Sequence, residues 1–458
     1  MTKHIFTLAF LLVLSEPSIA GERPYLEDAV KAARWIRSTS ISTPQGMVWA
    51  GDPGDSTTVG TTLYGGSAGV VLFLLEVYHS TGDTIYLADA RSGANYLLWQ
   101  LSDSTELTNL DNGLYTGIGG IGFTLGEVFK ATGESKYREG LRRSAELLRI
   151  RAAKFGNGVE WTYQQGADTT YFFTDIVSGS SGIGLFMLYA SRELKDAAYQ
   201  QIAVMAGRRL IEAGQRTDGG MKWAMDAREP KFTTMFGRLM PNFAHGTAGI
   251  CYFLASLYAE TKQKEFLDAA LQGTRYLLSI ADTDSNAARI FHDEPDNQQL
   301  YYLGWCHGPA GTARLFYRLY QITGDNEWMG WVKKFARAEL ISGIPEHQTP
   351  GFWNNVSICC GTASVADFFL SLYRITHELS YLDFSKRLTA NLLSRDTSDS
   401  KGIRWIQAEH RVRPGLLIAQ TGYMQGAAGI GMWLLRLDAF EQGKRESITL
   451  PDSPFQVR

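Results

Sequence analysis

Long apolar runs with no polar face recur along the chain, and each run begins just after a cluster of small residues. Runs such as GVVLFLLEVY from Gly69 and GICYFLASLY from Gly249 predict helices that are buried on all sides. Seven segments share this pattern, at a spacing of roughly 50 to 67 residues. Such self-similarity indicates an array of one supersecondary unit. The leading glycines of the seven clusters are Gly66, Gly117, Gly179, Gly246, Gly308, Gly361 and Gly426.

A second, amphipathic segment follows most of the apolar runs after a short turn. In SKYREGLRRSAELLRI from Ser135, charged residues lie beside an apolar stripe, which predicts a half-buried outer helix. Seven inner and seven outer helices close most simply into a ring. We therefore predict an all-α protein with an (α/α)7 toroid fold. Strand patterns are sparse and local, as at residues 221–224.

The glycines are expected at the N-terminus of every inner helix, where the helices converge on the ring axis. Residues without a side chain let neighbouring backbones approach closely there. If the units run in one sense, seven helix N-termini aim at one face, and their free N–H groups favour anions. We call this face the mouth, and we expect any chemistry on residues just before or within the small-residue clusters.

The first twenty residues have the order of a secretory signal. Lys3 supplies a positive start, residues 5–14 form an apolar core, and small residues precede a cut at Gly21. A buried first helix is the alternative. We predict a signal peptide over 1–20, a single domain over 21–458, and an exported protein, either periplasmic or secreted. No later stretch has about 18 uninterrupted apolar residues, so stable membrane insertion of the mature chain is not expected.

Charge and composition narrow the classes of function. The chain carries 44 Lys and Arg against 47 Asp and Glu, a net charge of −3. This balance lacks the basic footprint of a nucleic-acid-binding protein. Only four cysteines occur in 458 residues, so no disulfide framework is expected. The apolar share of 45% excludes wholesale disorder.

Three of the four cysteines lie at the predicted mouth. Cys306 precedes the fifth leading glycine, and Cys359 and Cys360 precede the sixth. Equivalent positions in consecutive repeats would be neighbours in the ring, and three thiolates there suit a Zn²⁺ ion with an open fourth position. A disulfide or inert buried thiols are the alternatives. Cys251 falls inside an inner helix, where we expect a small buried hydrophobe.

Two histidines and one aspartate are candidates for proton transfer at the same face. His245 lies one residue before the fourth leading glycine, and His307 directly follows Cys306. Histidine changes charge near neutral pH, so either ring is a candidate acid or base. Asp175 lies four residues before the third leading glycine. A helix N-cap or a solvated loop carboxylate is the alternative for this aspartate.

In combination these motifs resemble the lanthionine synthetase C-like (LanC-like) family. The resemblance rests on the glycine clusters, Trp-Cys-His-Gly at 305–308, Cys-Cys-Gly at 359–361 and His-Gly-x-Ala-Gly from His245. It covers residues 63–437 and implies an α/α toroid that binds one zinc ion. Cyclases of this family add a peptide cysteine thiol to dehydroalanine or dehydrobutyrine and so form a thioether (lanthionine) ring. Animal members are associated with glutathione.

The resemblance implies a set of metal ligands. Carried over to this chain, they are Cys306, Cys359 and Cys360, where most members have histidine at the third position. Many cyclases also carry arginine four residues before the first zinc cysteine, and this chain has Tyr302 there.

The resemblance also implies roles for the proton-transfer candidates and a partner. His245 matches the family histidine proposed to handle the proton during addition, and His307 matches a position that is tyrosine or histidine in relatives. Asp175 matches a residue thought to assist deprotonation. The substrate would be a peptide or a small thiol. Because no dehydratase domain precedes the first cluster, a separate dehydratase would supply the dehydrated peptide.

Two other classes of function remain open. One is an exported zinc-containing module that binds a peptide or thiol without turnover. The other is a carbohydrate-active toroid, which needs two carboxylates facing the ring. Asp175 and Asp367 are poor candidates because Asp367 lies inside a helix. Tryptophans such as Trp161, Trp223 and Trp405 suit either a sugar cleft or the packing of the outer layer.

Overall fold

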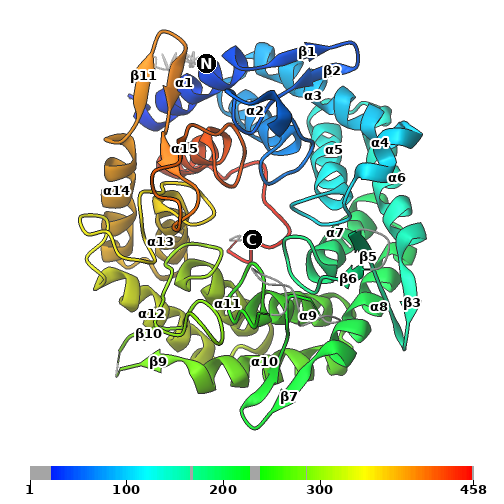
Figure 1. The fold of residues 1–458 in the computed structure, drawn as a ribbon. Helices are drawn as coiled ribbons and strands as arrows, with labels where there is room; N and C mark the ends of the chain where they lie inside the picture. The colour runs from blue at the N-terminus through cyan, green and yellow to red at the C-terminus, as the bar shows by residue number, and fades with distance from the viewer. Residues whose placement is uncertain (1–21, 166–168, 227–237, 285, 456–458) are drawn as a thin grey trace, which may run out of the picture.

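The computed structural model describes residues 22–165, 169–226, 238–284 and 286–455. Within these residues the helices form two concentric rings, which confirms the predicted (α/α)7 toroid (Figure 1). Each inner helix is 15 residues long and buried over most of its length. The inner helices are α2 (Ser67–Thr81), α5 (Ile118–Thr132), α7 (Ser180–Leu194), α9 (Thr247–Thr261), α11 (Pro309–Thr323), α13 (Thr362–Thr376) and α15 (Ala427–Glu441).

The outer ring packs against the inner ring, with one outer helix on each inner helix. Two short helices, α4 (Ser104–Asn109) and the 3-10 helix η1 (Ser56–Thr58), lie in connections. The outer helices of the described residues are α1 (Pro24–Ser38), α3 (Thr84–Ser102), α6 (Ser135–Arg151), α8 (Ala197–Ala213), α10 (Lys264–Ile280), α12 (Asn326–Leu340) and α14 (Leu379–Leu393).

The N-terminal helix closes the ring. Helices α3 to α14 of the outer ring each pack on the inner helix that precedes them, whereas α1 packs on α15, the last inner helix. Arg23 Nε donates to Asp438 Oδ1 at 3.0 Å across this junction. One helical unit is therefore built from both ends of the described chain.

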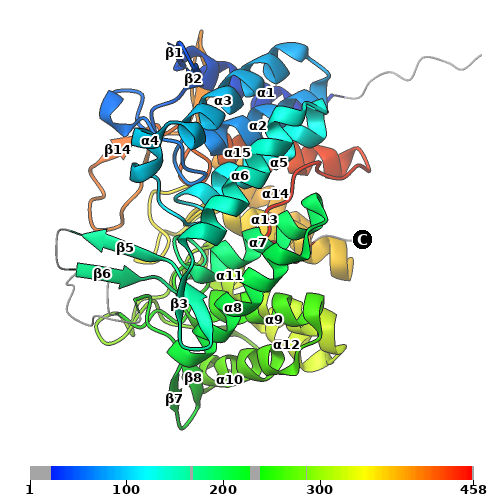
Figure 2. The same cartoon turned by 90° about the vertical axis from the view of Figure 1, so that its right-hand side faces the viewer.

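Two-stranded antiparallel hairpins lie on one side of the ring (Figure 2). Five of the described hairpins follow an outer helix. The strand expected at 221–224 overlaps β8 of one of them at residues 221 and 222, where β8 ends. The paired strands are β1 (Ile41–Thr43) with β2 (Gly46–Val48), β3 (Ala153–Phe155) with β4 (Gly158–Glu160), β5 (Thr162–Gln165) with β6 (Thr169–Phe172), β7 (Gln215–Thr217) with β8 (Gly220–Lys222), β9 (Asp282–Thr283) with β10 (Ala288–Arg289), β11 (Thr397–Asp399) with β12 (Gly402–Arg404), and β13 (Gln407–Ala408) with β14 (Leu417–Ile418).

Four tryptophans hold outer helices to the hairpins that follow them. Each donates its indole N–H to the backbone carbonyl thirteen residues earlier, at 2.7 to 3.1 Å. Their side chains are at most 2% exposed, so they pack in the outer layer and do not line a sugar cleft. The pairs are Trp49 with Ile36, Trp161 with Leu148, Trp223 with Leu210, and Trp405 with Leu392.

Each leading glycine is the N-cap residue of its inner helix, as predicted. At Gly246 a Cβ atom would stand 1.5 Å from the Met240 carbonyl oxygen, and at Gly308 it would stand 2.3 Å from the Leu303 carbonyl carbon. A larger residue would push the preceding loop off the helix. The glycines therefore let each loop fold tightly against the start of its helix.

Backbone hydrogen bonds join the seven loops before the inner helices into a closed circle, which we call the belt. Except at Ile176, each donor is the residue two positions before a leading glycine, so the belt surrounds the mouth with equivalent positions of all seven repeats. In ring order, N–H donors and C=O acceptors are Tyr64 to Tyr115, Tyr115 to Val177, Ile176 to Ala244, Ala244 to Cys306, Cys306 to Cys359, Cys359 to Met424 and Met424 to Tyr64, at 2.8 to 3.2 Å.

The C-terminal segment 446–455, which we call the tail, passes through the centre of the ring (Figure 1). The backbone N–H groups of Ser447 and Ile448 donate to the Glu76 carboxylate of α2 at 2.9 and 3.0 Å. Phe455 is 1% exposed and stacks on Tyr317 of α11, with ring centroids 5.1 Å apart. The tail is thus fixed to opposite parts of the inner ring.

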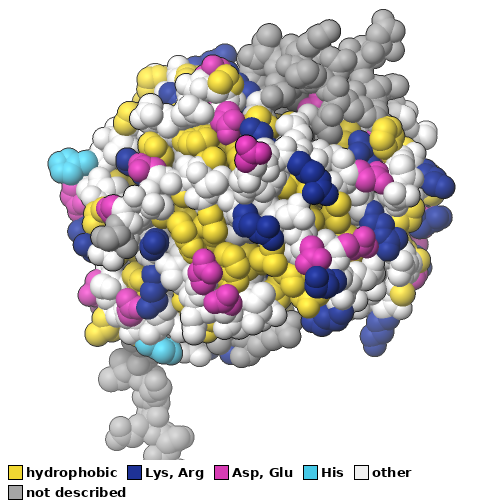
Figure 3. All heavy atoms as spheres, turned by 90° about the horizontal axis from the view of Figure 1, so that it is seen from below, with side chains coloured by type: hydrophobic (Ala, Val, Ile, Leu, Met, Phe, Trp, Pro, Cys, Tyr) yellow, Lys and Arg dark blue, Asp and Glu magenta, His cyan; other side chains and the backbone are white. Residues whose placement is uncertain are grey.

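The face seen from below carries interspersed basic and acidic side chains with apolar ones between them (Figure 3). Among the helices of the described residues, none combines the length and apolar character needed to cross a bilayer. The predicted signal peptide over 1–20 lies outside the described residues.

Candidate metal centre

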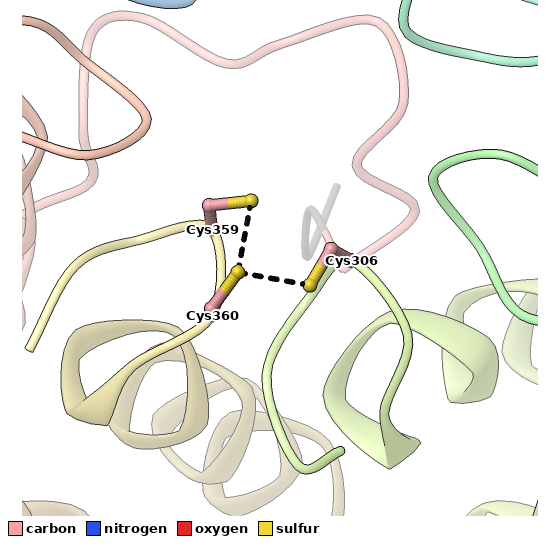
Figure 4. A group of neighbouring side chains, drawn as sticks. All are labelled: Cys306, Cys359 and Cys360. Carbon is pink, nitrogen blue, oxygen red and sulfur yellow. Dashed lines mark hydrogen bonds between the residues drawn. The ribbon is translucent and has the colours of Figure 1, made fainter. Parts of the chain in front are cut away.

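Three sulfur atoms meet at the mouth, where the loops before α11 and α13 lie side by side (Figure 4). Cys306 Sγ lies 3.1 Å from Cys360 Sγ, which lies 3.4 Å from Cys359 Sγ. All three atoms lie within 4.8 Å of one another, and the three residues are at most 8% exposed. The cysteines therefore converge, as their equivalent positions in consecutive repeats predict.

The spacing of the sulfurs fits a tetrahedral metal ion. Zinc–sulfur bonds of about 2.3 Å place two sulfurs about 3.8 Å apart, so the sulfur pairs at 3.1 and 3.4 Å would need to move apart by less than about 1 Å to bind zinc. In the described part of the chain, no other group of three His, Cys, Asp or Glu ligand atoms is this compact. All four cysteines are free thiols, so the structure contains none of the disulfides considered as alternatives. The cluster could hold one metal ion and would leave a fourth position for another ligand.

The cluster stabilises one thiolate. Hydrogen bonds from the Cys306 and Cys360 thiols hold the pKa of Cys359 well below its usual value. Burial raises the pKa of Cys306 well above its usual value. Tyr64 donates its hydroxyl to Cys359 Sγ at 3.4 Å, and Gln425 Nε2 donates to the Tyr64 hydroxyl at 3.0 Å. Further negative charge on these buried sulfurs requires a cation, which a metal ion would supply.

Asp175 and His245 form a hydrogen-bonded pair beside the cysteines. His245 Nδ1 lies 2.6 Å from Asp175 Oδ2, and the other carboxylate oxygen accepts the backbone N–H of Ser178 at 2.9 Å. Asp175 is fully buried and does not cap α7, because Gly179 is its N-cap residue. A carboxylate on Nδ1 favours the tautomer with the proton there and leaves Nε2 free to exchange a proton.

His307 lies between two other imidazole rings. Its ring centroid is 5.6 Å from that of His245 and 4.2 Å from that of His292. Burial, together with the charges of these two neighbours, lowers the pKa of His307 well below its usual value. The ring is only 6% exposed. His307 is therefore a neutral, enclosed group near pH 7.

A second histidine–carboxylate pair, which sequence reasoning missed, lies next to His307. His292 Nδ1 lies 2.5 Å from Asp293 Oδ2. The same carboxylate accepts from Asn297 at 2.8 Å and pairs with Arg238 at 2.7 Å. Burial opposes ionisation, but these hydrogen bonds outweigh it and lower the pKa of Asp293. The pair thus repeats the arrangement of Asp175 and His245 on another loop.

At the mouth, the hydroxyl of Tyr302 accepts a hydrogen bond from a guanidinium group. The Tyr302 ring lies 4.3 Å from that of His292 and 5.1 Å from that of Trp353. Arg411, between β13 and β14, donates through Nε to the Tyr302 hydroxyl at 3.3 Å. The arginine that many cyclases carry at position 302 is absent here, yet a guanidinium from a loop 109 residues away lies beside this position.

The belt explains which of these residues the sequence reveals. Tyr64 and Gln425 lie two residues and one residue before a leading glycine, in the same positions as the cysteines and His245. Aligning the seven repeats would therefore have revealed them. His292 and Arg411 lie 16 and 15 residues before the next leading glycine, outside the small-residue clusters, so the repeat pattern does not mark them.

Cys251 is separate from the metal centre, as predicted. It is fully buried in α9 and faces Gly273 of α10, where a Cβ atom would stand 2.1 Å from its sulfur. Burial raises the pKa of the Cys251 thiol. It is a core residue.

The fold and this site define a class of protein: an α/α toroid with a three-cysteine candidate metal site where the inner helices begin. The chain belongs to the lanthionine synthetase C-like protein family, whose model matches residues 57–449. This match confirms the family that the motifs indicate.

Two relatives match part of the chain. The zebrafish (Danio rerio) protein named glutathione S-transferase LANCL1 is 24% identical over 139 residues, which are 30% of this chain and 32% of the relative. The Arabidopsis thaliana LanC-like protein GCL1 is 27% identical over 168 residues, which are 36% of this chain and 35% of the relative. The matched segments span about one third of these relatives' length.

Solved structures share the fold over nearly the whole chain. Nisin cyclase superposes with a TM-score of 0.64 at 16% identity, covering 94% of this chain and 97% of the cyclase. A GH76 α-mannanase from Bacteroides thetaiotaomicron superposes with a TM-score of 0.53 at 11% identity, covering 92% and 97%. At these identities the likeness shows the toroid fold alone.

Proposed function

We propose that the protein is a zinc-dependent enzyme that adds a thiol to a dehydroalanine or dehydrobutyrine residue of a peptide and so forms a thioether. The observation that carries this proposal is the convergence of Cys306, Cys359 and Cys360 at the mouth, beside the pair of Asp175 and His245. Membership of the LanC-like family supports it.

The three cysteines would hold the zinc ion and leave its fourth position for a thiol. When bound, zinc would lower the pKa of an incoming thiol, so that it reacts as a thiolate near pH 7. The protein contributes the geometry. The belt ties the backbones of Cys306 and Cys359 to neighbouring loops, and Tyr64 and Gln425 orient the sulfurs through hydrogen bonds.

His245 is the first candidate for proton transfer. Attack of a sulfur on the β-carbon places negative charge on the neighbouring carbonyl oxygen, and the α-carbon then takes up a proton. With Nδ1 held by Asp175, the free Nε2 of His245 can pass that proton. His307 is the second candidate. The Tyr302 hydroxyl and the Arg411 guanidinium would stabilise charge on the carbonyl oxygen.

We further propose that a separate dehydratase supplies the peptide and that the protein is exported. The order of charge, apolar core and small residues at 1–20 supports export. Fusion of residues 1–25 to a reporter that is active only outside the cytoplasm tests it. An inactive reporter, with an active fusion to a known signal as control, would contradict export.

The decisive experiment combines metal analysis with a reaction. The purified protein should contain about one zinc per chain, and Cys306→Ala should lose it while Cys251→Ala keeps it. Incubation of the zinc-loaded protein with a dehydroalanine peptide and a thiol should then give a product heavier by the mass of the thiol. Zinc without product would leave a zinc-containing binding module, and no zinc would contradict the proposal.

A carbohydrate-active toroid is less well supported, although a mannanase shares the fold. Retaining or inverting hydrolysis needs two carboxylates across the scissile bond. Asp175 is bonded to His245, and Asp367 of α13 is ion-paired with Arg436 of α15. Neither carboxylate is therefore free to act on a sugar.

A further inference from the structure

One carboxylate of the tail contacts the loop that carries Cys306, from inside the ring. Asp452 is fully buried. Its Oδ2 accepts the indole N–H of Trp305 at 3.1 Å and the hydroxyl of Tyr115 at 3.1 Å. Trp305 directly precedes Cys306, and Tyr115 is a belt residue of the second repeat. A single side chain thus joins the cysteine loop to a distant part of the belt.

Two donors and a cation surround the Asp452 carboxylate. Arg314 of α11 donates to the Asp452 backbone carbonyl at 3.1 Å and lies 3.5 Å from Oδ2. Burial and the charge of Asp452 raise the pKa of Tyr115 well above its usual value, so its hydroxyl keeps the proton that it donates. A buried carboxylate with two neutral donors and a cation is a fixed anchor.

Trp305 differs from the tryptophans of the outer layer. Those donate to helix carbonyls of their own unit, whereas Trp305 donates to the tail. Its backbone N–H is also held, by Ser364 Oγ at 3.2 Å, and its ring contacts those of Tyr115 and Phe243 at 5.2 and 5.8 Å. Fixed at both ends, the indole leaves the adjacent Cys306 little freedom.

The tail itself is held on both sides of Asp452. Gln321 Nε2 donates to the Pro454 carbonyl at 2.9 Å, and Glu446 pairs with Arg374 at 2.9 Å. Displacement of Asp452 therefore requires release of the whole segment from the inner ring.

We propose that Asp452 is a positioning residue of the metal centre: through the Trp305 indole it sets the place of the Cys306 sulfur. The inference rests on the proposed metal site and adds the tail to it. Groups that hydrogen-bond a metal ligand are worth about 10- to 100-fold in metal affinity, and Asp452 acts through the residue next to the ligand, so we expect the lower end of this range. The tail would then act on the metal centre without touching the metal.

The test compares two tryptophans that each lose one indole N–H. Trp305→Phe removes the bond to Asp452, and Trp223→Phe removes the bond to the Leu210 carbonyl, far from the cysteines. The full protein is freed of metal and titrated with Co²⁺, whose visible spectrum reports ligand geometry. Both variants should unfold at lower temperature. Only Trp305→Phe should shift the Co²⁺ spectrum and weaken binding, by about tenfold.

Substitutions of the carboxylate separate the hydrogen bond from the charge. Asp452→Asn keeps an acceptor oxygen and should stay near the wild-type spectrum, whereas Asp452→Ala should follow Trp305→Phe. If Trp305→Phe matches Trp223→Phe or the wild type in Co²⁺ affinity and spectrum, the inference is wrong. If the wild-type protein binds no Co²⁺, the proposed function fails first, and the positioning role with it.

Discussion

At the scale of single residues, the mouth holds two histidine–carboxylate pairs on either side of a neutral imidazole. Asp175 with His245 and Asp293 with His292 have the same geometry, a buried carboxylate on Nδ1. Thiol addition needs a proton removed from the thiol and a proton delivered to carbon. In the proposed reaction, the pair that delivers the proton to carbon should be recognisable by substitution.

We predict that His245→Asn lowers the rate of thiol addition by about 100-fold, because the proton-transfer group is lost. Zinc content should remain at the wild-type level, since His245 is not a ligand. The rate is measured with a dehydroalanine peptide under zinc saturation. His292→Asn is the matched control and should have a much smaller effect. A larger loss in His292→Asn would transfer the role to the second pair.

At the scale of helices, the packing of the inner ring depends on glycines, whose lack of a side chain lets loop and helix approach closely. Gly311 lies in the first turn of α11, and a Cβ atom there would stand 1.8 Å from the Trp305 carbonyl oxygen. Gly330 lies in the exposed face of α12, where a Cβ atom would have no neighbour within 4 Å. Substitution by alanine should therefore lower the stability of the protein at Gly311 and raise it at Gly330.

We predict that Gly311→Ala lowers the free energy of unfolding by about 1–3 kcal/mol, because the cysteine loop must shift. Gly330→Ala should raise it by about 0.5–1 kcal/mol, since glycine is costly inside a helix. Urea unfolding of the metal-free proteins measures both values. Equal effects at the two sites would contradict the close approach of loop and helix.

The ion pairs between the tail and the inner helices predict a pH dependence. Burial alone would raise the pKa of Glu446, but the cations of Arg436 and Arg374 lower it from its usual 4.5 to about 2. Because the folded-state pKa is the lower one, the pair stabilises the protein above pH 4.5 and is lost as the pH falls towards 2. The full shift in the pKa of Glu446 corresponds to a contribution of about 3 kcal/mol to the free energy of unfolding.

Glu446→Gln should therefore reduce stability at pH 7 by about 1–3 kcal/mol and flatten the loss of stability between pH 4.5 and 2. Glu441→Gln is the control, because its pair with Lys386 is more exposed and should be worth under about 1 kcal/mol. Urea unfolding at a series of pH values measures both. An unchanged acid limb in Glu446→Gln would show that the tail is not held by this charge.

At the scale of the whole molecule, the candidate metal centre lies among the contacts that close the ring. The cysteines join the fifth and sixth repeats, the belt joins all seven, and α1 completes the last unit. An ion bound only by the folded ring stabilises it in proportion to the logarithm of its concentration.

If zinc binds at this site, its removal should lower the unfolding temperature. Free zinc at a thousand times its dissociation constant should then raise the free energy of unfolding of the metal-free protein by about 4 kcal/mol. Calorimetry at increasing zinc concentrations measures the shift. Cys306→Ala should unfold at a temperature that does not respond to zinc. A response that persists in this variant would place the stabilising ion elsewhere.

Much of the fold and of the candidate site could be predicted from positions that repeat along the chain. The seven glycines identify the inner helices, and the convergence of Cys306 with Cys359 and Cys360 follows from their equivalent positions. Contacts of residues outside the repeat pattern could not be predicted in this way. His292, which had no assigned place in the sequence, lies against His307, and Arg411 reaches Tyr302 across 109 positions. These contacts depend on how irregular loops fold over the mouth.

The sequence by itself determined the toroid, its seven units and the face where the cysteines meet. Each of these follows from a local pattern repeated seven times, because similar units bury their apolar faces by stacking side by side. The tertiary structure alone decided that α1 completes the last unit, that His292 lies against His307, and that the tail anchors Trp305. Each of these contacts involves a segment outside the small-residue clusters, and the repeat pattern does not encode where such a segment packs.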